Sequence, residues 1–212
     1  MKIRSMTRWF AVLLVSAASM LAGAARAADE APDVFIKRLS TEVLQLIKTD
    51  KSIQSGEVDR IVALVDAKVM PNVNFDRMAA SAIGPAWRKA TPEQKKRLQV
   101  EFKNLLVRTY AGALTEIGNQ TVVVKPVRAA ADDKEVVVRS EVAGQGDVIQ
   151  LDYRLEKTPG QGSGWKIYNL NVLGVWMVET YRNQFRPVIN EKGLDGLIST
   201  LAERNKTNAR DR

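Results

Sequence analysis

The chain has 212 residues, with 32 basic and 24 acidic side chains and neither histidine nor cysteine. Without these two residue types the chain lacks the commonest general base, the usual zinc and copper ligands and the thiol nucleophile, and it cannot form disulfides. It also contains no Gly-x-Ser-x-Gly motif, glycine-rich phosphate loop or His-Glu-x-x-His motif, so the common hydrolase, nucleotide-binding and zinc-protease signatures are missing.

The first 27 residues have the pattern of a secretory signal peptide. Three basic residues precede an apolar stretch, and a small-residue cleavage pattern ends at Ala27. The stretch is short for a membrane span and is diluted with small residues, which favours cleavage over an uncleaved anchor. Removing 1–27 leaves 28 basic and 24 acidic side chains, a net charge of +4. We expect an exported chain with one domain at 28–205 and a polar tail at 206–212.

The first half of the exported chain has the apolar period of helices. Helices are predicted over three ranges: 33–48, 57–70 and 74–84. The best-marked helix follows, because Thr91 and Gln94 form a capping box and Pro92 suits the first helical position. Its apolar stripe extends to Gly118, where a glycine ends the helix.

After Gly118 the apolar period changes to two, which is typical of strands. Four strands with short connections are predicted, and these favour an antiparallel meander: 121–127, 135–142, 148–156 and 165–172. The third alternates apolar with polar residues, so one face of the sheet is covered and the other is wet. Helices at 175–185 and 194–204 close the chain. This order predicts an α+β fold with helices on the covered face of the sheet.

Two other signals have ordinary structural explanations. Asp132 and Asp133 lie at a predicted hairpin turn, where aspartate is common, and they supply too few ligands for Ca²⁺. Basic residues around Trp87 only superficially suggest a nucleic-acid surface, because the chain is exported and these cations are ordinary exposed positions. The abundant apolar residues leave two interpretations open, a filled core or a cavity, since both use the same residue types.

Three segments carry a resemblance to a known family. They are 65–114, which begins VDAKVMPNVNF, 164–185, which reads GWKIYNLNVLGVWMVETYRNQF, and 191–201, which reads EKGLDGLISTL. In order and spacing they resemble the MlaC family, also called the toluene-tolerance family, an auxiliary component of the Mla ABC transport system. Two positions depart from the family pattern: Trp176 stands where a small residue is common, and Leu173 where an acidic residue is often found.

The resemblance implies a four-stranded curved antiparallel sheet and about six to seven helices that enclose an apolar pocket. It implies a monomeric periplasmic carrier that binds glycerophospholipid by its acyl chains, with no cofactor, metal or catalytic activity. The implied partners are an outer-membrane lipoprotein–porin complex and an inner-membrane ABC transporter with an MCE-domain subunit, and the implied role is to maintain outer-membrane lipid asymmetry. The alternatives are a lipid-free adaptor of the transporter with a filled core and, thirdly, a secreted enzyme that uses lone carboxylates.

The predicted lining of the pocket consists of apolar residues from the helices and strands that this fold would bring together. These residues are Val73, Phe75, Ile83, Trp87, Phe102, Leu106, Tyr110, Leu151, Tyr153, Ile167, Leu170, Val172, Val175 and Trp176. Arg88 and Arg182 are candidates for the pocket rim, where a cation would meet phosphate. The indole of Trp176 is expected to fill pocket volume or close its mouth, so Trp176→Ser is expected to change the amount or chain length of bound lipid.

Overall fold

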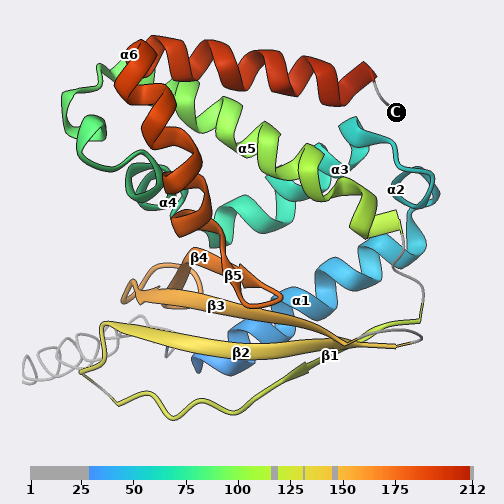
Figure 1. Cartoon of the computed structure of the whole chain (residues 1–212). Coiled ribbons are helices and arrows are strands. Elements are labelled where there is room, and N and C mark those ends of the chain that lie inside the picture. Colours follow the sequence, from blue (N-terminus) through green and yellow to red (C-terminus); the bar gives the residue numbers. More distant parts are fainter. Residues whose placement is uncertain (1–28, 116–118, 131, 145–147, 211–212) are drawn as a thin grey trace, which may run out of the picture.

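The chain forms a layer of helices above an antiparallel sheet (Figure 1). The structure is a computed structural model and describes residues 29–115, 119–130, 132–144 and 148–210. The helices before the sheet are α1 (Pro32–Thr49), α2 (Lys51–Gln54), α3 (Val58–Leu64), α4 (Phe75–Ile83) and α5 (Pro92–Thr115), with short π and 3₁₀ turns at η1 (Val65–Val69), η2 (Met70–Asn72) and η3 (Gly84–Lys89). The sheet and the last helix are β1 (Thr121–Val124), β2 (Glu135–Ala143), β3 (Ile149–Lys157), β4 (Trp165–Val172), β5 (Val175–Trp176) and α6 (Met177–Arg210).

The predicted α+β class is confirmed, with a curved, open antiparallel sheet in the order β1-β2-β3-β4-β5. The sheet as described has five strands, not the four predicted. The added strand, β5, occupies the place where a helix was predicted to begin at Val175. The predicted signal peptide at 1–27 and the predicted helix end at Gly118 lie outside the described residues.

A two-residue turn between β4 and β5 explains the missed strand. Leu173 has φ 52° and Gly174 has φ 87°, and Val172 pairs with Val175 across the turn. Two successive left-handed residues give the tight turn that suits antiparallel neighbours. Leucine rarely adopts positive φ, so Leu-Gly does not predict a two-residue hairpin turn, whereas Asn-Gly would.

Helix α6 contains both C-terminal helices that the sequence predicted, and they meet at a kink. The helical run is broken only at Gly193, whose φ of 67° is outside the helical range. In Figure 1, α6 rises from the sheet, bends, and crosses the top of the molecule above α5. It continues to Arg210, so much of the predicted polar tail at 206–212 is helical.

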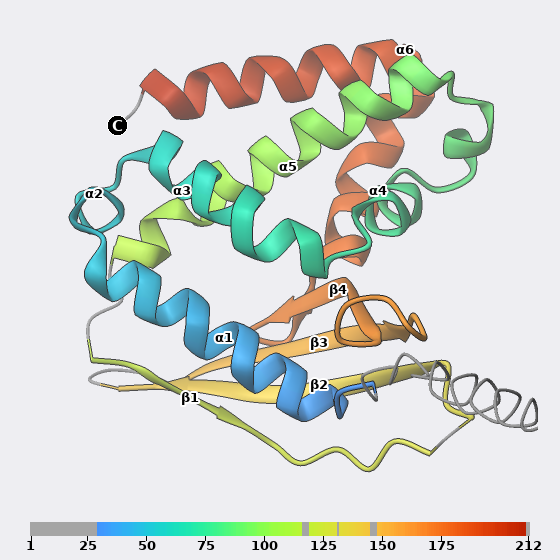
Figure 2. The same cartoon turned by 180° about the vertical axis from the view of Figure 1, so that it is seen from behind.

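Three apolar clusters hold the layers together. The largest lies among α4, α5 and α6 and contains Phe75, Phe102, Tyr181 and Phe185. A second packs α1 against the sheet, and a third joins the end of α1 to α2, α3 and α5. Figures 1 and 2 show the resulting arrangement, in which α1 lies along β1 and β2 while α5 belongs to the upper layer.

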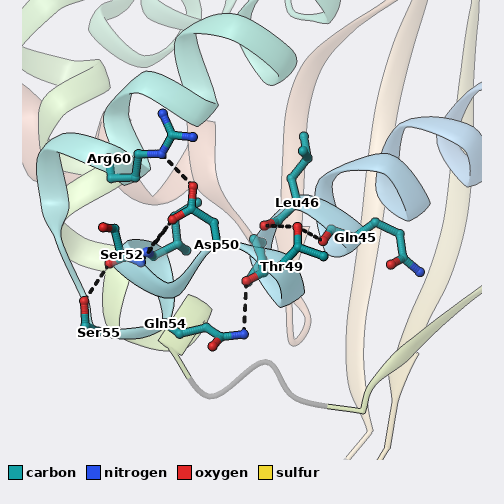
Figure 3. A network of polar contacts seen from close by, with 10 residues as sticks. Gln45, Leu46, Thr49, Asp50, Ser52, Gln54, Ser55 and Arg60 are labelled. Carbon is teal, nitrogen blue, oxygen red and sulfur yellow. Dashed lines mark hydrogen bonds and ion pairs between the residues drawn. The ribbon is translucent and has the colours of Figure 1, made fainter.

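A polar network turns the chain from α1 into α2 and α3 (Figure 3). One carboxylate oxygen of Asp50 accepts hydrogen bonds from the backbone N–H groups of Ser52 and Ile53, which caps α2. Its other oxygen accepts from Nε of Arg60 at 2.6 Å. The Arg60 guanidinium holds the pKa of Asp50 below its ordinary value. This network sets the position of α3, and with it Ile61 in the third cluster.

A second network fastens α4 to the sheet. The guanidinium of Arg77 pairs with Glu156 and, at 2.5 Å, with Glu135, and it stacks over the Tyr168 ring with 3.6 Å from Cζ to the ring centroid. Asn74, which caps α4, also donates to Glu156 at 2.5 Å. The hydrogen bond from Arg77 and a second from Tyr168 hold the pKa of Glu135 below its ordinary 4.5.

Arg77→Ala is expected to lower the free energy of unfolding by about 1–2 kcal/mol, because partly exposed ion pairs and cation–π contacts each contribute up to about 1 kcal/mol. The pKa of Glu135 is lowered on folding, so its stabilisation is present above about pH 4.5 and is lost as the pH falls through the folded pKa. On acidification the free energy of unfolding, measured with urea, should therefore fall more in the wild type than in Arg77→Ala. An equal fall in the two proteins would contradict the role of Arg77 in lowering the pKa of Glu135.

Candidate functional site

The face of the sheet turned towards the helices is apolar, and we call it the inner face. Cross-strand register places Val138, Tyr153 and Leu170 side by side on it, because directly opposed residues share a face. The next row along the strands contains Leu151 and Val172. The side chains of the inner face contact α1 through the second cluster and the upper helices through the first.

Burial on the inner face changes along the strands. Val138 and Leu155 are 0% exposed where α1 covers them, whereas Leu151, Leu170 and Val172 remain partly exposed. A filled core would enclose all these positions equally, because protein interiors are close-packed. The inner face is therefore closely covered along β2 and where α1 packs on it, and incompletely covered over Leu151, Leu170 and Val172.

Helix α5 shows the same change in burial. Phe102 and Leu105 are 1% exposed within the helical core, but Leu106 is partly exposed and Tyr110 is 36% exposed. The Tyr110 hydroxyl lies 2.9 Å from the sulfur of Met177, the first residue of α6. Because α6 follows β5 directly, this contact brings the later turns of α5 towards the less covered part of the inner face, on β3 and β4.

Tyr153 brings a polar group to the inner face, opposite Val138 and beside the part that α1 covers. The Tyr153 hydroxyl lies near Ser40 of α1 and Ser140 of β2, and the Ser140 hydroxyl donates to the Leu151 carbonyl oxygen at 2.8 Å. Burial raises the pKa of Tyr153 above its ordinary value of 10.0, against the smaller opposite effect of the two serines. Tyr153 is therefore a neutral phenol at neutral pH, which suits an apolar surrounding.

The predicted lining residues divide into two groups. Four of them lie in the close-packed core among α4, α5 and α6: Phe75, Ile83, Trp87 and Phe102. Ile167 is buried between α1 and the sheet. Val73 packs against both clusters. The structure brings the remaining partly covered residues together around the inner face: Leu106, Tyr110, Leu151, Tyr153, Leu170, Val172 and Val175.

Trp176 is separated from the other predicted residues of the sheet. It pairs with Asn171, which opposes Asp152, and this parity places its side chain on the outer face. There the Arg154 guanidinium stacks on the indole, with Cζ 4.0 Å from the ring centroid. Val175, its neighbour, pairs with Val172 on the inner face and is 49% exposed.

Glu179 completes the environment of Trp176. Its carboxylate accepts hydrogen bonds from Arg154 at 2.5 Å and from Asn169 at 2.8 Å. Burial opposes ionisation, but these two hydrogen bonds hold the pKa of Glu179 below its ordinary value. The outer face beside β5 is thus a charged contact that fastens the start of α6 to the sheet.

The two predicted rim arginines lie at the end of the helical layer. Arg88 is exposed on η3, and Arg182 is exposed on α6, where its Nε donates to the carbonyl oxygen of Ser81 at 2.7 Å. This contact joins α6 to the end of α4.

Several residues of the site were missing from the sequence prediction. Val138, Ser140 and Val142 of β2 lie on the inner face with at most 9% exposure, and Ser40 reaches it from α1. The period-two spacing of the β2 residues was the available signal. It identifies which residues share a face but leaves open which face the helices cover.

Two hollows elsewhere on the described surface differ from the inner face in their lining. A hollow of about 430 Å³ beside Arg77 and another of about 650 Å³ along α6 are lined mostly by polar or charged residues. The acidic residues in the described ranges form no group of three or more suited to a metal ion. None of the helices described is both long enough and apolar enough to cross a membrane.

Comparison with known proteins gives consistent matches over most of the chain. The intermembrane phospholipid transport system binding protein MlaC of Haemophilus influenzae is 22% identical over 204 residues, which cover 96% of this chain and 95% of that protein. The toluene tolerance protein ttg2D of Pseudomonas putida is 31% identical over 170 residues, covering 79% of this chain and 77% of that protein.

A solved structure is more similar in sequence than either. The phospholipid-binding protein from Ralstonia solanacearum, determined in complex with a phospholipid, is 46% identical and superposes with a TM-score of 0.80. The match covers 84% of this chain and 99% of that one. The sequence profile of the MlaC protein family matches residues 37–203. The resemblance inferred from the sequence is therefore confirmed, and the chain belongs to the MlaC family.

Proposed function

We propose that this protein is a carrier that binds a glycerophospholipid by its acyl chains between the inner face of the sheet and the upper helices. The observation that carries the proposal is the partly covered apolar inner face around Leu151, Leu170 and Val172. The 46% identical relative that was solved with a phospholipid supports it. Leu106 and Tyr110 of α5 and Tyr153 of β3 would contact the same chains.

Physical chemistry explains why such a lipid needs an enclosing protein. A palmitoyl chain has about 14 methylenes, each worth ~0.8 kcal/mol on removal from water, so one tail represents on the order of 11 kcal/mol. Free phospholipid therefore does not cross an aqueous space at a useful rate. A carrier needs a large apolar surface and no reactive groups, which agrees with a sequence that lacks histidine and cysteine. The proposal accordingly contains no catalytic step and no cofactor.

The proposed place of work is the periplasm, supported by the signal-peptide pattern of residues 1–27. There the carrier would pass lipid between an outer-membrane lipoprotein–porin complex and an inner-membrane ABC transporter with an MCE-domain subunit. This transfer would maintain the lipid asymmetry of the outer membrane. The carrier would act as a monomer. The name of the Haemophilus relative, which refers to intermembrane phospholipid transport, supports this traffic.

Organic extraction of the purified protein, followed by mass spectrometry, tests the central claim. We expect stoichiometric glycerophospholipid in the extract and a matching mass increase in native mass spectrometry. A protein that stays lipid-free after incubation with phospholipid vesicles would favour the alternative of a lipid-free adaptor with a filled core.

Trp176→Ser tests the placement of the indole. Because Trp176 stacks on Arg154 on the outer face, we now expect the variant to keep the amount and chain length of bound lipid. Its free energy of unfolding should fall by about 1–2 kcal/mol, since a cation–π contact and apolar packing are lost. A changed lipid profile measured by mass spectrometry would show that the indole contacts the pocket, as the sequence alone suggested.

A further inference from the structure

A cluster of basic residues lies at the end of the helical layer. Between Gly84 and Arg97 the chain carries five cations and one carboxylate, that of Glu93. Helix α6 adds two more cations to this end. We call the set the cationic end: Arg88, Lys89, Lys95, Lys96, Arg97, Arg182 and Arg186.

Tertiary contacts bring these segments together. The hydrogen bond from Arg182 to Ser81 joins α6 to the end of α4, which continues directly into η3. Further along α6, Asp195 accepts a hydrogen bond at 3.0 Å from Gln94 in the first turn of α5. Figures 1 and 2 show the start of α5 beside the bend of α6, and α4 beside the part of α6 that rises from the sheet.

The cations of this end are not neutralised. None of the seven forms an ion pair with any residue that the structure describes, and all but Lys95 are classed as exposed. Elsewhere, cations such as Arg38 and Lys103 are paired with carboxylates at 2.8 Å and 2.6 Å. The seven cations thus give this end an excess of positive charge over its carboxylates, Glu93 and Asp195.

We propose that the cationic end docks the protein on the surface of a bilayer that contains anionic phospholipid. Clustered cations are attracted to anionic headgroups, whose negative potential acts on many side chains at once. A protein partner fits this surface less well, because protein interfaces are enriched in aromatic anchors and depleted of lysine. The aromatic residue in this region, Trp87, is only 8% exposed.

The inference deepens the proposed function and rests on it for its purpose, since docking would bring the carrier to the membranes that supply and receive lipid. It also gives the predicted rim residues Arg88 and Arg182 a different role. They would contact the headgroups of a membrane and not the phosphate of a lipid held in the pocket.

Vesicle co-sedimentation tests the proposal. Vesicles of phosphatidylcholine with about 30% phosphatidylglycerol should bind the wild type, and vesicles of phosphatidylcholine alone should not. The triple variant Lys89→Glu, Lys96→Glu, Arg97→Glu should bind the anionic vesicles on the order of 100-fold more weakly. This loss corresponds to two tenfold steps in affinity, each equivalent to about 1.4 kcal/mol of binding free energy. Glutamate is compatible with the first turns of α5, because acidic residues suit a helix N-terminus.

A matched control has the same net charge. Lys37→Glu, Lys51→Glu, Arg128→Glu changes three exposed cations on α1, α2 and the segment after β1, away from the cationic end. It should keep most of the vesicle binding. Equal losses in both variants would show that overall charge and not this surface is responsible, and would overturn the proposal.

Two further outcomes are decisive. Binding should weaken strongly between about 0.1 M and 1 M salt, because the screening length falls from about 10 Å to 3 Å. The proposal would also be overturned if the wild-type protein did not bind anionic vesicles but bound an acidic protein surface. Bound lipid, measured by extraction, should be equal in wild type and both variants, so failure of docking is distinguishable from failure of lipid binding.

Discussion

Leu151→Asp is expected to lose the bound phospholipid while the protein stays folded. Leu151 lies on the inner face between Ser140 and Val172, and its side chain is partly exposed. The new carboxylate would keep its water until acyl chains cover it. Burying a polar group without a partner costs roughly 2–7 kcal/mol, so affinity should fall by at least about 30-fold. Extraction and mass spectrometry should find far less lipid per protein than in the wild type.

The matched control places the same substitution on the opposite face. Val137 of β2 is 40% exposed, and it opposes Arg154 on the outer face. Val137→Asp should therefore keep both the fold and the lipid. Circular dichroism of the two variants separates loss of lipid from loss of structure. Full lipid occupancy in folded Leu151→Asp would place the acyl chains somewhere other than the inner face.

The order of elements was predictable from the sequence because each depends on local chemistry. The capping box at Thr91 and Gln94 forms as expected, with the Gln94 N–H donating to the Thr91 hydroxyl at 3.1 Å. The alternation in β3 predicted one covered face, and Leu155 and Tyr153 do lie together on it. The sequence did not reveal β5, because its turn depends on Leu173 adopting a conformation that leucine rarely takes.

The site was less predictable than the fold. Phe102 and Leu106 belong to the same apolar stripe of α5, yet one is enclosed by helices and the other remains partly exposed. That difference arises from the tertiary positions of α1 and α6, which no local pattern encodes. Trp176 is a similar case, since its face is decided by the register of a two-residue hairpin, and a shift of one residue reverses the face.

Phe102→Ala is expected to lower the free energy of unfolding of the lipid-free protein by about 3–5 kcal/mol, the usual range for removing a buried phenylalanine. Phe102 is 1% exposed and packs with ring-centroid distances of 5.7 Å to Phe75, 5.0 Å to Tyr181 and 5.3 Å to Phe185. The cavity left among one ring of α4 and two rings of α6 cannot close without moving α4 or α6. Urea unfolding of lipid-free protein measures the effect.

This variant also decides between the two interpretations that the sequence left open for Phe102. If its ring is core, as the packing indicates, the loss of stability appears without lipid and the variant that remains folded still binds phospholipid. Val100→Ala on the same helix is the matched control, because Val100 is 46% exposed and surface changes usually stay within about 0.5 kcal/mol. A loss below about 1 kcal/mol for Phe102→Ala, well short of the usual core range, together with loss of lipid would show that the ring lines the pocket, and would extend the site from the inner face into the helical layer.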